Sequence, residues 1–193
     1  SQTELIRRVA EVNKNLAVVL LCGSVVDLEW EANAKSILLM HLGGEAVGGA
    51  VADLVTGGAC PAGKLAESWP LHLADNPSYA YFPGYTRTVE YRESIFVGYR
   101  YYDTAQKPVR YPFGYGLSYT SFSYSNLQLS ADRLNAGETL HVSLDVTNTG
   151  SVAGAEVVQL FVSHRSEVMF TAEQELKGFE RVFLAPGETK SVQ

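Results

Sequence analysis

Acidic side chains in segments without a regular pattern are the residues of this sequence best suited to chemistry. Two carboxyl groups that face each other across a bond can supply the acid–base and nucleophilic steps of glycosidic bond cleavage. Spacing along the chain does not show which of these groups face one another. The candidates are Asp27, Glu29, Glu31, Glu67, Asp75, Glu90, Glu93 and Asp103.

Glu93 is the most enclosed of these candidates in sequence. It lies between Tyr91 and Phe96, with Arg92 and Arg100 close by. The plainest interpretation is a buried ion pair with one of these arginines. A contact to a sugar hydroxyl is the alternative, and an acid–base role comes third. If the segment contacts a substrate, Tyr91 and Glu93 are the substrate-binding residues that we predict.

Metal and nucleotide chemistry find little support. Gly58–Lys64, GACPAGK, has the spacing of a phosphate-binding loop, but Leu65 follows where Ser or Thr would hold magnesium. The four histidines are scattered without metal-ligand spacing. Cys22 and Cys60 do not suggest a disulfide framework. We expect no cofactor and no metal site.

The composition of the chain is that of an acidic globular protein. Its 193 residues carry a net charge of −6 and no run of Lys or Arg, which argues against a nucleic-acid partner. No apolar run approaches the ~20 residues that a membrane-spanning helix needs. We therefore expect neither nucleic acid nor membrane as a partner.

The stretch Tyr91–Thr120 stands where the pattern of the chain changes. It holds nine aromatic residues together with glycines and prolines at fixed points. Aromatic side chains indicate a buried or ligand-facing segment. The glycines and prolines predict a specified backbone path rather than regular helix or strand.

The residues before this stretch predict an α/β arrangement. A helix is expected over 1–15, with Ser1 and Glu4 at capping-box spacing. Apolar runs at 16–22 and 36–42 predict strands covered on both faces. A second helix is expected over 45–56, with Glu45 in its first turn and close backbone packing at Gly48 and Gly49.

The residues after this stretch predict an antiparallel β-sandwich. Alternation and turn residues place strands at 122–129, 140–147, 155–163, 176–184 and from 189 onward. A sandwich of this kind needs about seven strands and about 100 residues. The chain supplies 72 residues from Phe122, so we expect the sandwich to be incomplete. Two parallel strands also make a poor sheet, so we expect the α/β part to be incomplete as well.

Several motifs together resemble the C-terminal part of the family-3 glycoside hydrolases, the β-glucosidase and β-xylosidase group. The most specific are YRESIFVGYRYYD at 91–103 and YPFGYGLSYT at 111–120. GSVVDLEW, LGGEAVGGAVADLVTG and CPAGKLAESWP resemble the family upstream of these. VTNTGSVAGAEVVQLFV and ELKGFERVFLAPGET resemble its fibronectin type III-like domain.

The resemblance implies a fold and a function. It implies part of an α/β sandwich domain over 1–120, with an aromatic connector, followed by a truncated fibronectin type III-like (immunoglobulin-like) sandwich over 121–193. It implies part of a retaining β-glycosidase acting on terminal β-glucosides or related β-glycosides. The family's aspartate nucleophile lies in a barrel domain and its acid–base glutamate lies before the position of Ser1. The chain is therefore expected to hold no catalytic residue and to be inactive alone.

The partners that the resemblance implies are a β-linked glycoside in the full enzyme and the barrel domain of the same protein. The unfinished edge of the predicted sandwich would in addition allow a second copy to pair with it. Two other functions remain open on the residues alone. One is a non-catalytic carbohydrate-binding module, and the other is a structural or interaction fragment. The compartment also remains open, with a slight preference for the cytoplasm.

Overall fold

The computed structural model describes residues 1–84, 87–165 and 168–193. They divide into two compact units, which we describe separately. The first comprises residues 1–58 and 71–73, and the second comprises residues 59–70 and 74–193. Among the described residues, no helix is long and apolar enough to cross a membrane.

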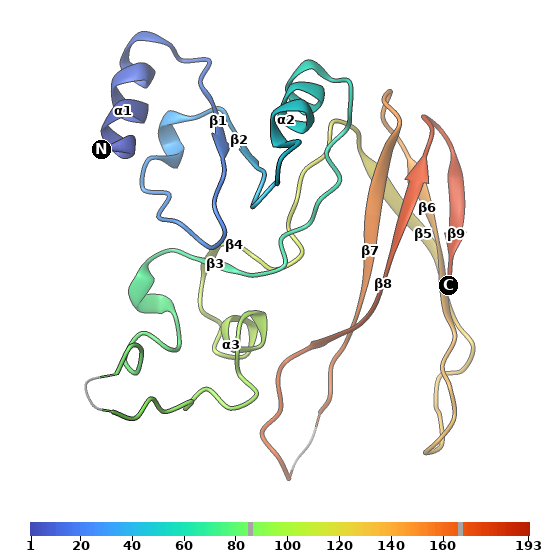
Figure 1. Cartoon of the computed structure of the whole chain (residues 1–193). Helices are drawn as coiled ribbons and strands as arrows, with labels where there is room; N and C mark the ends of the chain where they lie inside the picture. The colour runs from blue at the N-terminus through green and yellow to red at the C-terminus, as the bar shows by residue number, and fades with distance from the viewer. Residues whose placement is uncertain (85–86, 166–167) are drawn as a thin grey trace. The chain divides into compact units, whose positions relative to one another are not determined.

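The first unit is a small α/β arrangement. It contains α1 (Gln2–Val12), β1 (Ala17–Leu20), η1 (Glu31–Asn33), β2 (Ser36–Leu39) and α2 (Val47–Thr56). The two strands pair in parallel, from Ala17 opposite Ser36 to Leu20 opposite Leu39. Figure 1 shows the two strands between the two helices, with α1 on the side of β1 and α2 on the side of β2.

The ends of the helices follow their sequence signals in part. The hydroxyl of Ser1 accepts a hydrogen bond from the Glu4 amide at 3.3 Å, as the capping pattern predicted. Gly57 ends α2 in the left-handed conformation, at φ 80°. The placement of Glu45 was wrong, because α2 begins at Val47 and its N-cap is Ala46.

Two packing predictions for the first unit were also wrong. A Cβ on Gly48 or Gly49 would meet no described atom within 4 Å, so no close approach explains these glycines here. The strands β1 and β2 are half-buried rather than covered on both faces. Each has one strand neighbour among the described residues, which leaves an edge of each open.

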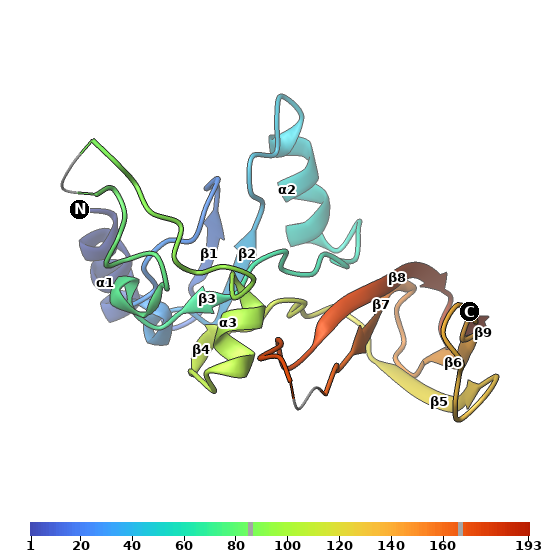
Figure 2. The same ribbon diagram turned by 90° about the horizontal axis from the view of Figure 1, so that it is seen from below.

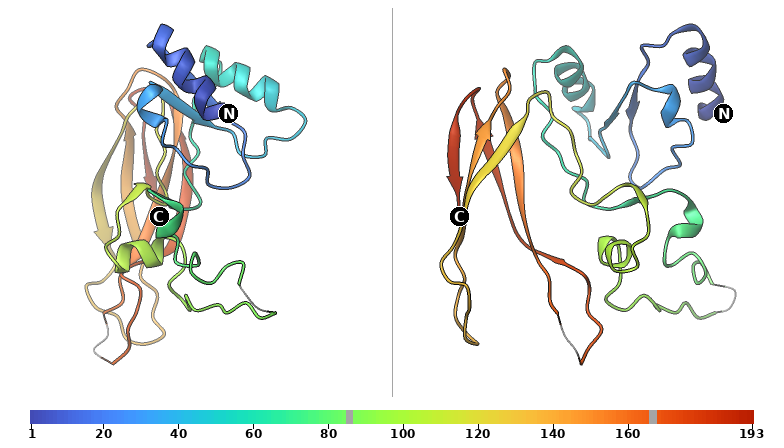
Figure 3. Two further views of the ribbon diagram at one scale, coloured as in Figure 1. Left: turned by 90° about the vertical axis from the view of Figure 1, so that its left-hand side faces the viewer. Right: turned by 180° about the vertical axis from the view of Figure 1, so that it is seen from behind.

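The second unit contains the β-sandwich. One sheet has the order β5-β6-β9, formed by β5 (Phe122–Leu129), β6 (Val142–Asn148) and β9 (Thr189–Val192). The other pairs β7 (Gly154–Val162) with β8 (Glu175–Leu184). All pairings are antiparallel, and Figures 1 and 3 show the two sheets face to face. The predicted strands are confirmed, with bounds that differ by one or two residues at most ends.

Aliphatic side chains from both sheets form the core of the sandwich. It consists of Val146, Val158, Val182, Leu184 and Val192, with Phe122 and Leu144 packed against it. Asn148 is fully buried beside this core and uses both ends of its amide. Its oxygen accepts from Thr120 Oγ1 at 2.6 Å, and its nitrogen donates to the carbonyls of Val152 and Leu184. Asn148 therefore links Thr120, Val152 and Leu184 by hydrogen bonds.

The stretch Tyr91–Thr120 contains more regular structure than its sequence predicted. It holds α3 (Tyr99–Thr104) and β4 (Val109–Tyr111), which pairs with β3 (Trp69–Pro70). Both elements are short and depend on contacts with residues distant in sequence. Figure 2, seen from below, shows α3 close to β3 and β4.

Residues 113–120 pack against the segment 60–65 and against the sandwich. Gly114 donates its amide to the Leu65 carbonyl at 2.8 Å, and Leu65 donates to the Tyr115 carbonyl at 2.8 Å. Gly116 approaches so closely that an added Cβ would lie 2.2 Å from the Gly63 carbonyl oxygen. Only glycine fits at that position. Within this unit, residues 113–120 therefore connect the segment 60–65 to the sandwich.

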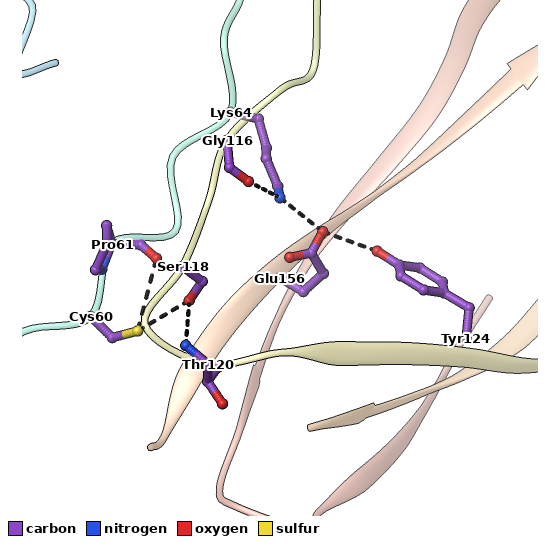
Figure 4. A network of polar contacts seen from close by, with 8 residues as sticks. All are labelled: Cys60, Pro61, Lys64, Gly116, Ser118, Thr120, Tyr124 and Glu156. Atoms are coloured by element: carbon purple, nitrogen blue, oxygen red, sulfur yellow. Dashed lines mark hydrogen bonds and ion pairs between the residues drawn. The ribbon is translucent and has the colours of Figure 1, made fainter. Parts of the chain in front are cut away.

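Charged and polar side chains reinforce the connector (Figure 4). Lys64 Nζ donates to the Gly116 carbonyl at 2.9 Å and lies 3.1 Å from Glu156 Oε1. The Tyr124 hydroxyl donates to the same carboxylate oxygen at 3.0 Å. Burial raises the pKa of Tyr124, and the charge of Glu156 adds to that effect. Lys64, the last residue of the GACPAGK segment, therefore has a structural role, since it bonds to Gly116 and Glu156.

Candidate functional site

Glu93 lines a hollow formed by residues of the described part of the chain. This hollow has a volume of about 430 Å³ and lies within the second unit. Four of its nine lining residues are aromatic, and Glu93 and Arg92 are its charged residues. The lining residues are Pro77, Tyr81, Arg92, Glu93, Phe96, Tyr101, Thr104, Ala105 and Phe170.

The carboxylate of Glu93 has no ion-pair or hydrogen-bond partner among the described side chains. The predicted ion pair with an arginine was therefore wrong. Arg92 instead pairs with Glu90, and its guanidinium carbon lies 4.8 Å from the centre of the Tyr81 ring. Arg100 Nε lies 3.4 Å from Glu175 Oε1. Glu93 is half-buried, so its free carboxylate can accept hydrogen bonds from a ligand in the hollow.

Arg92 contributes a positive charge to the lining of the hollow that also contains Glu93. The hydrogen bond and the charge of Glu90 raise the pKa of Arg92 above its ordinary value. The guanidinium also lies over an aromatic face, which favours a cation at that place. The hollow therefore combines a paired cation, an unpaired carboxylate and apolar walls.

Tyr91 lies differently from Glu93. It is 91% exposed and is not among the residues that line the hollow. Of the two predicted binding residues, Glu93 therefore lines the hollow, whereas Tyr91 lies at the surface outside it.

The helix α3 positions one wall of the hollow. It contributes Tyr101 and Thr104, while Tyr102 is buried at 4% exposure. Burial raises the pKa of the Tyr102 hydroxyl, with smaller effects from Tyr101 and Asp75. The ring of Tyr99 stacks on that of Phe113 at 4.7 Å between centres. Aromatic packing thus fixes a helix of only six residues.

Several other candidate carboxylates already have partners. Asp75 Oδ1 lies 2.8 Å from Lys107 Nζ, and Asp103 accepts from Gln174 Nε2 at 2.9 Å. Asp27 accepts from the amide of Glu29 at 2.9 Å. In the described part of the chain no cluster of three or more His, Cys, Asp or Glu could hold a metal ion. Both cysteines are free.

Sequence reasoning missed three aromatic residues of the hollow, Tyr81, Tyr101 and Phe170. Tyr101 belongs to the aromatic stretch that the sequence singled out. Phe170 belongs to the connection between β7 and β8, and no local pattern relates it to Glu93. A smaller hollow of about 230 Å³ at the same connection also uses Phe170.

Comparison with protein families identifies both parts of the chain. Residues 1–119 match the glycosyl hydrolase family 3 C-terminal domain. Residues 156–193 match the fibronectin type III-like domain. The chain belongs to glycosyl hydrolase family 3. The predicted family and fold class, an α/β domain portion followed by a fibronectin type III-like sandwich, are confirmed.

Individual relatives agree with this assignment. The chain is 50% identical to thermostable beta-glucosidase B of Acetivibrio thermocellus, over 100% of this chain and 25% of that protein. It superposes on the GH3 beta-glucosidase of Bifidobacterium adolescentis with a TM-score of 0.94 and 45% identity, covering 99% of this chain and 28% of that one. The beta-glucosidase of Kluyveromyces marxianus, solved in complex with glucose, superposes with a TM-score of 0.91 and 42% identity. This match covers 99% of the present chain and 23% of the Kluyveromyces chain. The chain thus spans about a quarter of the length of these relatives.

Proposed function

We propose that this chain is the C-terminal part of a retaining β-glucosidase that hydrolyses terminal β-glucosides or related β-glycosides. The observation that carries the proposal is the match of the entire chain, at 50% identity, to a β-glucosidase. In a retaining enzyme one carboxylate forms a glycosyl-enzyme and a second protonates the leaving group. Both carboxylates are proposed to belong to polypeptide outside these residues, which match the family's C-terminal domain and the fibronectin type III-like domain.

The chain itself supplies scaffold and a contact on the leaving-group side. Glu93 is the residue proposed for that contact, because its carboxylate lines the hollow and has no partner among the described side chains. Tyr91, which is largely exposed, is proposed to contact the same ligand from outside the hollow. The domain boundary is proposed at 120, just before β5 begins at Phe122.

Substitution of Glu93 in the whole protein tests this role. A hydrogen bond to a charged group contributes about 1.5–3 kcal/mol, and each 1.4 kcal/mol is a factor of ten. Glu93→Gln is therefore expected to lower kcat/KM by about tenfold for an aryl β-glucoside whose leaving ring carries a hydroxyl, mainly through a higher KM. Glu180→Gln, a change at an exposed strand position, is the matched control and should leave both constants unchanged. Equal kinetics for the two variants would remove Glu93 from the site.

The isolated 193-residue chain provides a second test. Since neither catalytic carboxylate belongs to it, it should release no aryl alcohol from an aryl β-glucoside. Appreciable turnover by the purified chain would contradict the assignment of both carboxylates to outside polypeptide. Binding of a glycan without turnover, lost on Tyr91→Ala, would instead favour a carbohydrate-binding module.

The barrel domain of the same protein is the proposed partner of this chain. A second copy is proposed as a further partner, through the open strand edges of the sandwich. Support for this contact comes from β5 and β9, which each have one strand neighbour in the described part of their sheet. Sedimentation of the whole protein should then show dimers whose fraction rises with concentration. A monomer at all concentrations would exclude the second copy.

A further inference from the structure

The connection between β7 and β8 is attached to α3 by several polar contacts. The amide of Glu173 donates to Thr104 Oγ1 at 2.9 Å, and Gln174 Nε2 donates to Asp103 Oδ2 at 2.9 Å. These bonds join residues of the part matched by the fibronectin type III-like domain to residues of the part matched by the family-3 C-terminal domain.

The same attachment continues into the first residues of β8. The amide of Leu176 donates to the Tyr99 hydroxyl at 2.8 Å. The carboxylate of Glu175 lies 3.4 Å from Arg100 Nε. Hydrogen bonds and an ion pair therefore hold both ends of the six-residue helix α3 to one short segment, 173–176. A helix this short has little stability of its own, so its position depends on these contacts.

Phe170 extends the attachment into the hollow itself. Its ring lies 4.9 Å from that of Phe96, and both side chains line the hollow that contains Glu93. Phe170 is nevertheless 78% exposed, so most of its surface is available to a bound group. The fibronectin-like domain thus contributes an apolar wall to the hollow.

Phe96 links this wall to the candidate binding residue. Its amide donates to the carbonyl of Glu93 at 2.9 Å, which closes a turn around Ser94 at φ 53°. The segment 170–176 is thereby connected to the backbone of Glu93, through the ring contact of Phe170 with Phe96 and the hydrogen bond of the Phe96 amide.

We propose that Phe170 determines specificity for the leaving group, and that Gln174 is a positioning residue for Glu93. The leaving group favoured by this arrangement is aromatic, because a ring can pack on Phe170 and Phe96 while a hydroxyl on it donates to Glu93. This inference rests on the proposed function of the hollow as a leaving-group site. It adds that the fibronectin-like domain is part of that site.

Kinetics of the whole protein test the role of Phe170. Phe170→Ala is expected to raise KM for an aryl β-glucoside about fivefold, with kcat changed less than twofold and KM for methyl β-glucoside unchanged. Phe170→Tyr should restore the aryl KM, because it keeps the ring. Phe179→Ala is the matched control, since Phe179 belongs to the same domain, is 73% exposed and does not line the hollow. Equal effects of Phe170→Ala and Phe179→Ala, or equal losses on both substrates, would overturn the inference.

Amide hydrogen exchange tests the positioning role without any assay of activity. Gln174→Ala in the whole protein is expected to speed exchange at the Phe96 amide at least fivefold, while amides within β6 and β7 keep their rates. Glu180→Gln should change neither. An unchanged rate at Phe96 would overturn the role of Gln174. If the wild-type protein cleaves no β-glucoside, the proposed function fails, but this exchange measurement still decides whether the segment holds Glu93.

Discussion

The two units of the chain differ in how they bury their apolar residues. The sandwich closes a core of aliphatic side chains, of which Val146 and Leu184 are fully buried. In the first unit α2 buries no residue, and Val12 of α1 is 88% exposed. A parallel sheet is normally covered on both faces, and two strands alone are marginal. The sandwich is therefore predicted to hold most of the stability of these residues.

Leu184→Ala should have the largest effect on this difference. Removal of a fully buried leucine from a packed core costs about 2–5 kcal/mol of unfolding free energy. Hydrogen exchange in the whole protein should show the loss in β5 to β9 and not in α1. Leu5→Ala, at a site 64% exposed, is the control and should cost less than about 0.5 kcal/mol. Similar losses for both variants would mean that the two units are not packed differently.

Loss of the Glu156 charge should have the second largest effect on the free energy of unfolding. Its side chain and that of Lys64 are 11% and 16% exposed, so the pair is largely removed from water. Breaking such a pair from one side costs about 3–5 kcal/mol when burial is complete, and we expect about 2 kcal/mol for Glu156→Gln here. Denaturant unfolding of the second unit measures this loss of unfolding free energy.

The double variant Lys64→Met with Glu156→Leu sharpens that measurement. Replacement of both charges by apolar groups removes the unpaired charge, so most of the lost stability should return. Coupling close to zero between the two sites would show that the ion pair does not stabilise the connector.

Ser1→Ala should have a smaller effect, confined to the first unit. The hydroxyl of Ser1 caps α1 through the Glu4 amide, and such a cap contributes about 1 kcal/mol. Exchange at the Glu4 amide should rise while β6 and β7 stay protected. Ser1→Thr keeps the acceptor and serves as the control. A change in the sandwich strands would contradict the separation of the two units.

Acid should give the smallest effect, in the sandwich. The backbone bond from Ala185 lowers the pKa of Glu188 below 4.5, and the bond from Asn126 lowers that of Asp145 below 3.8. A carboxyl group whose pKa is lower in the folded state than in the unfolded state stabilises the fold at pH values above its unfolded pKa. This stabilisation is lost as the pH falls through the folded pKa. Unfolding midpoints of the second unit should therefore fall below about pH 4.5. Glu188→Gln should flatten this slope, and an unchanged slope would exclude Glu188 as a contributor.

The sequence predicted the sandwich better than the region around Glu93, for physical reasons. The strand β6 alternates apolar and polar residues, and turn residues separate the strands β5 to β9, which are local signals. The helix α3 is too short for such a signal, and it depends on residues 173–176. Contacts of this range are invisible in a local pattern.

The error about the arginine partner of Glu93 has a local cause. Arg92 pairs with Glu90, two residues earlier, and not with its neighbour Glu93. Residues two apart share a side in an extended chain, so adjacency in sequence was a poor guide to the partner. Phe170 could not have been found in this way, since the fold alone brings it to Phe96.

The anomer first released by the whole protein tests the central claim most directly. Proton NMR during hydrolysis of an aryl β-glucoside separates the two anomers of free glucose before they equilibrate. A retaining β-glucosidase releases the β-anomer first, because two displacements at the anomeric carbon restore its configuration. Early appearance of β-glucose is the result expected for the protein that contains this chain. Release of α-glucose first, or no release of glucose, would contradict it.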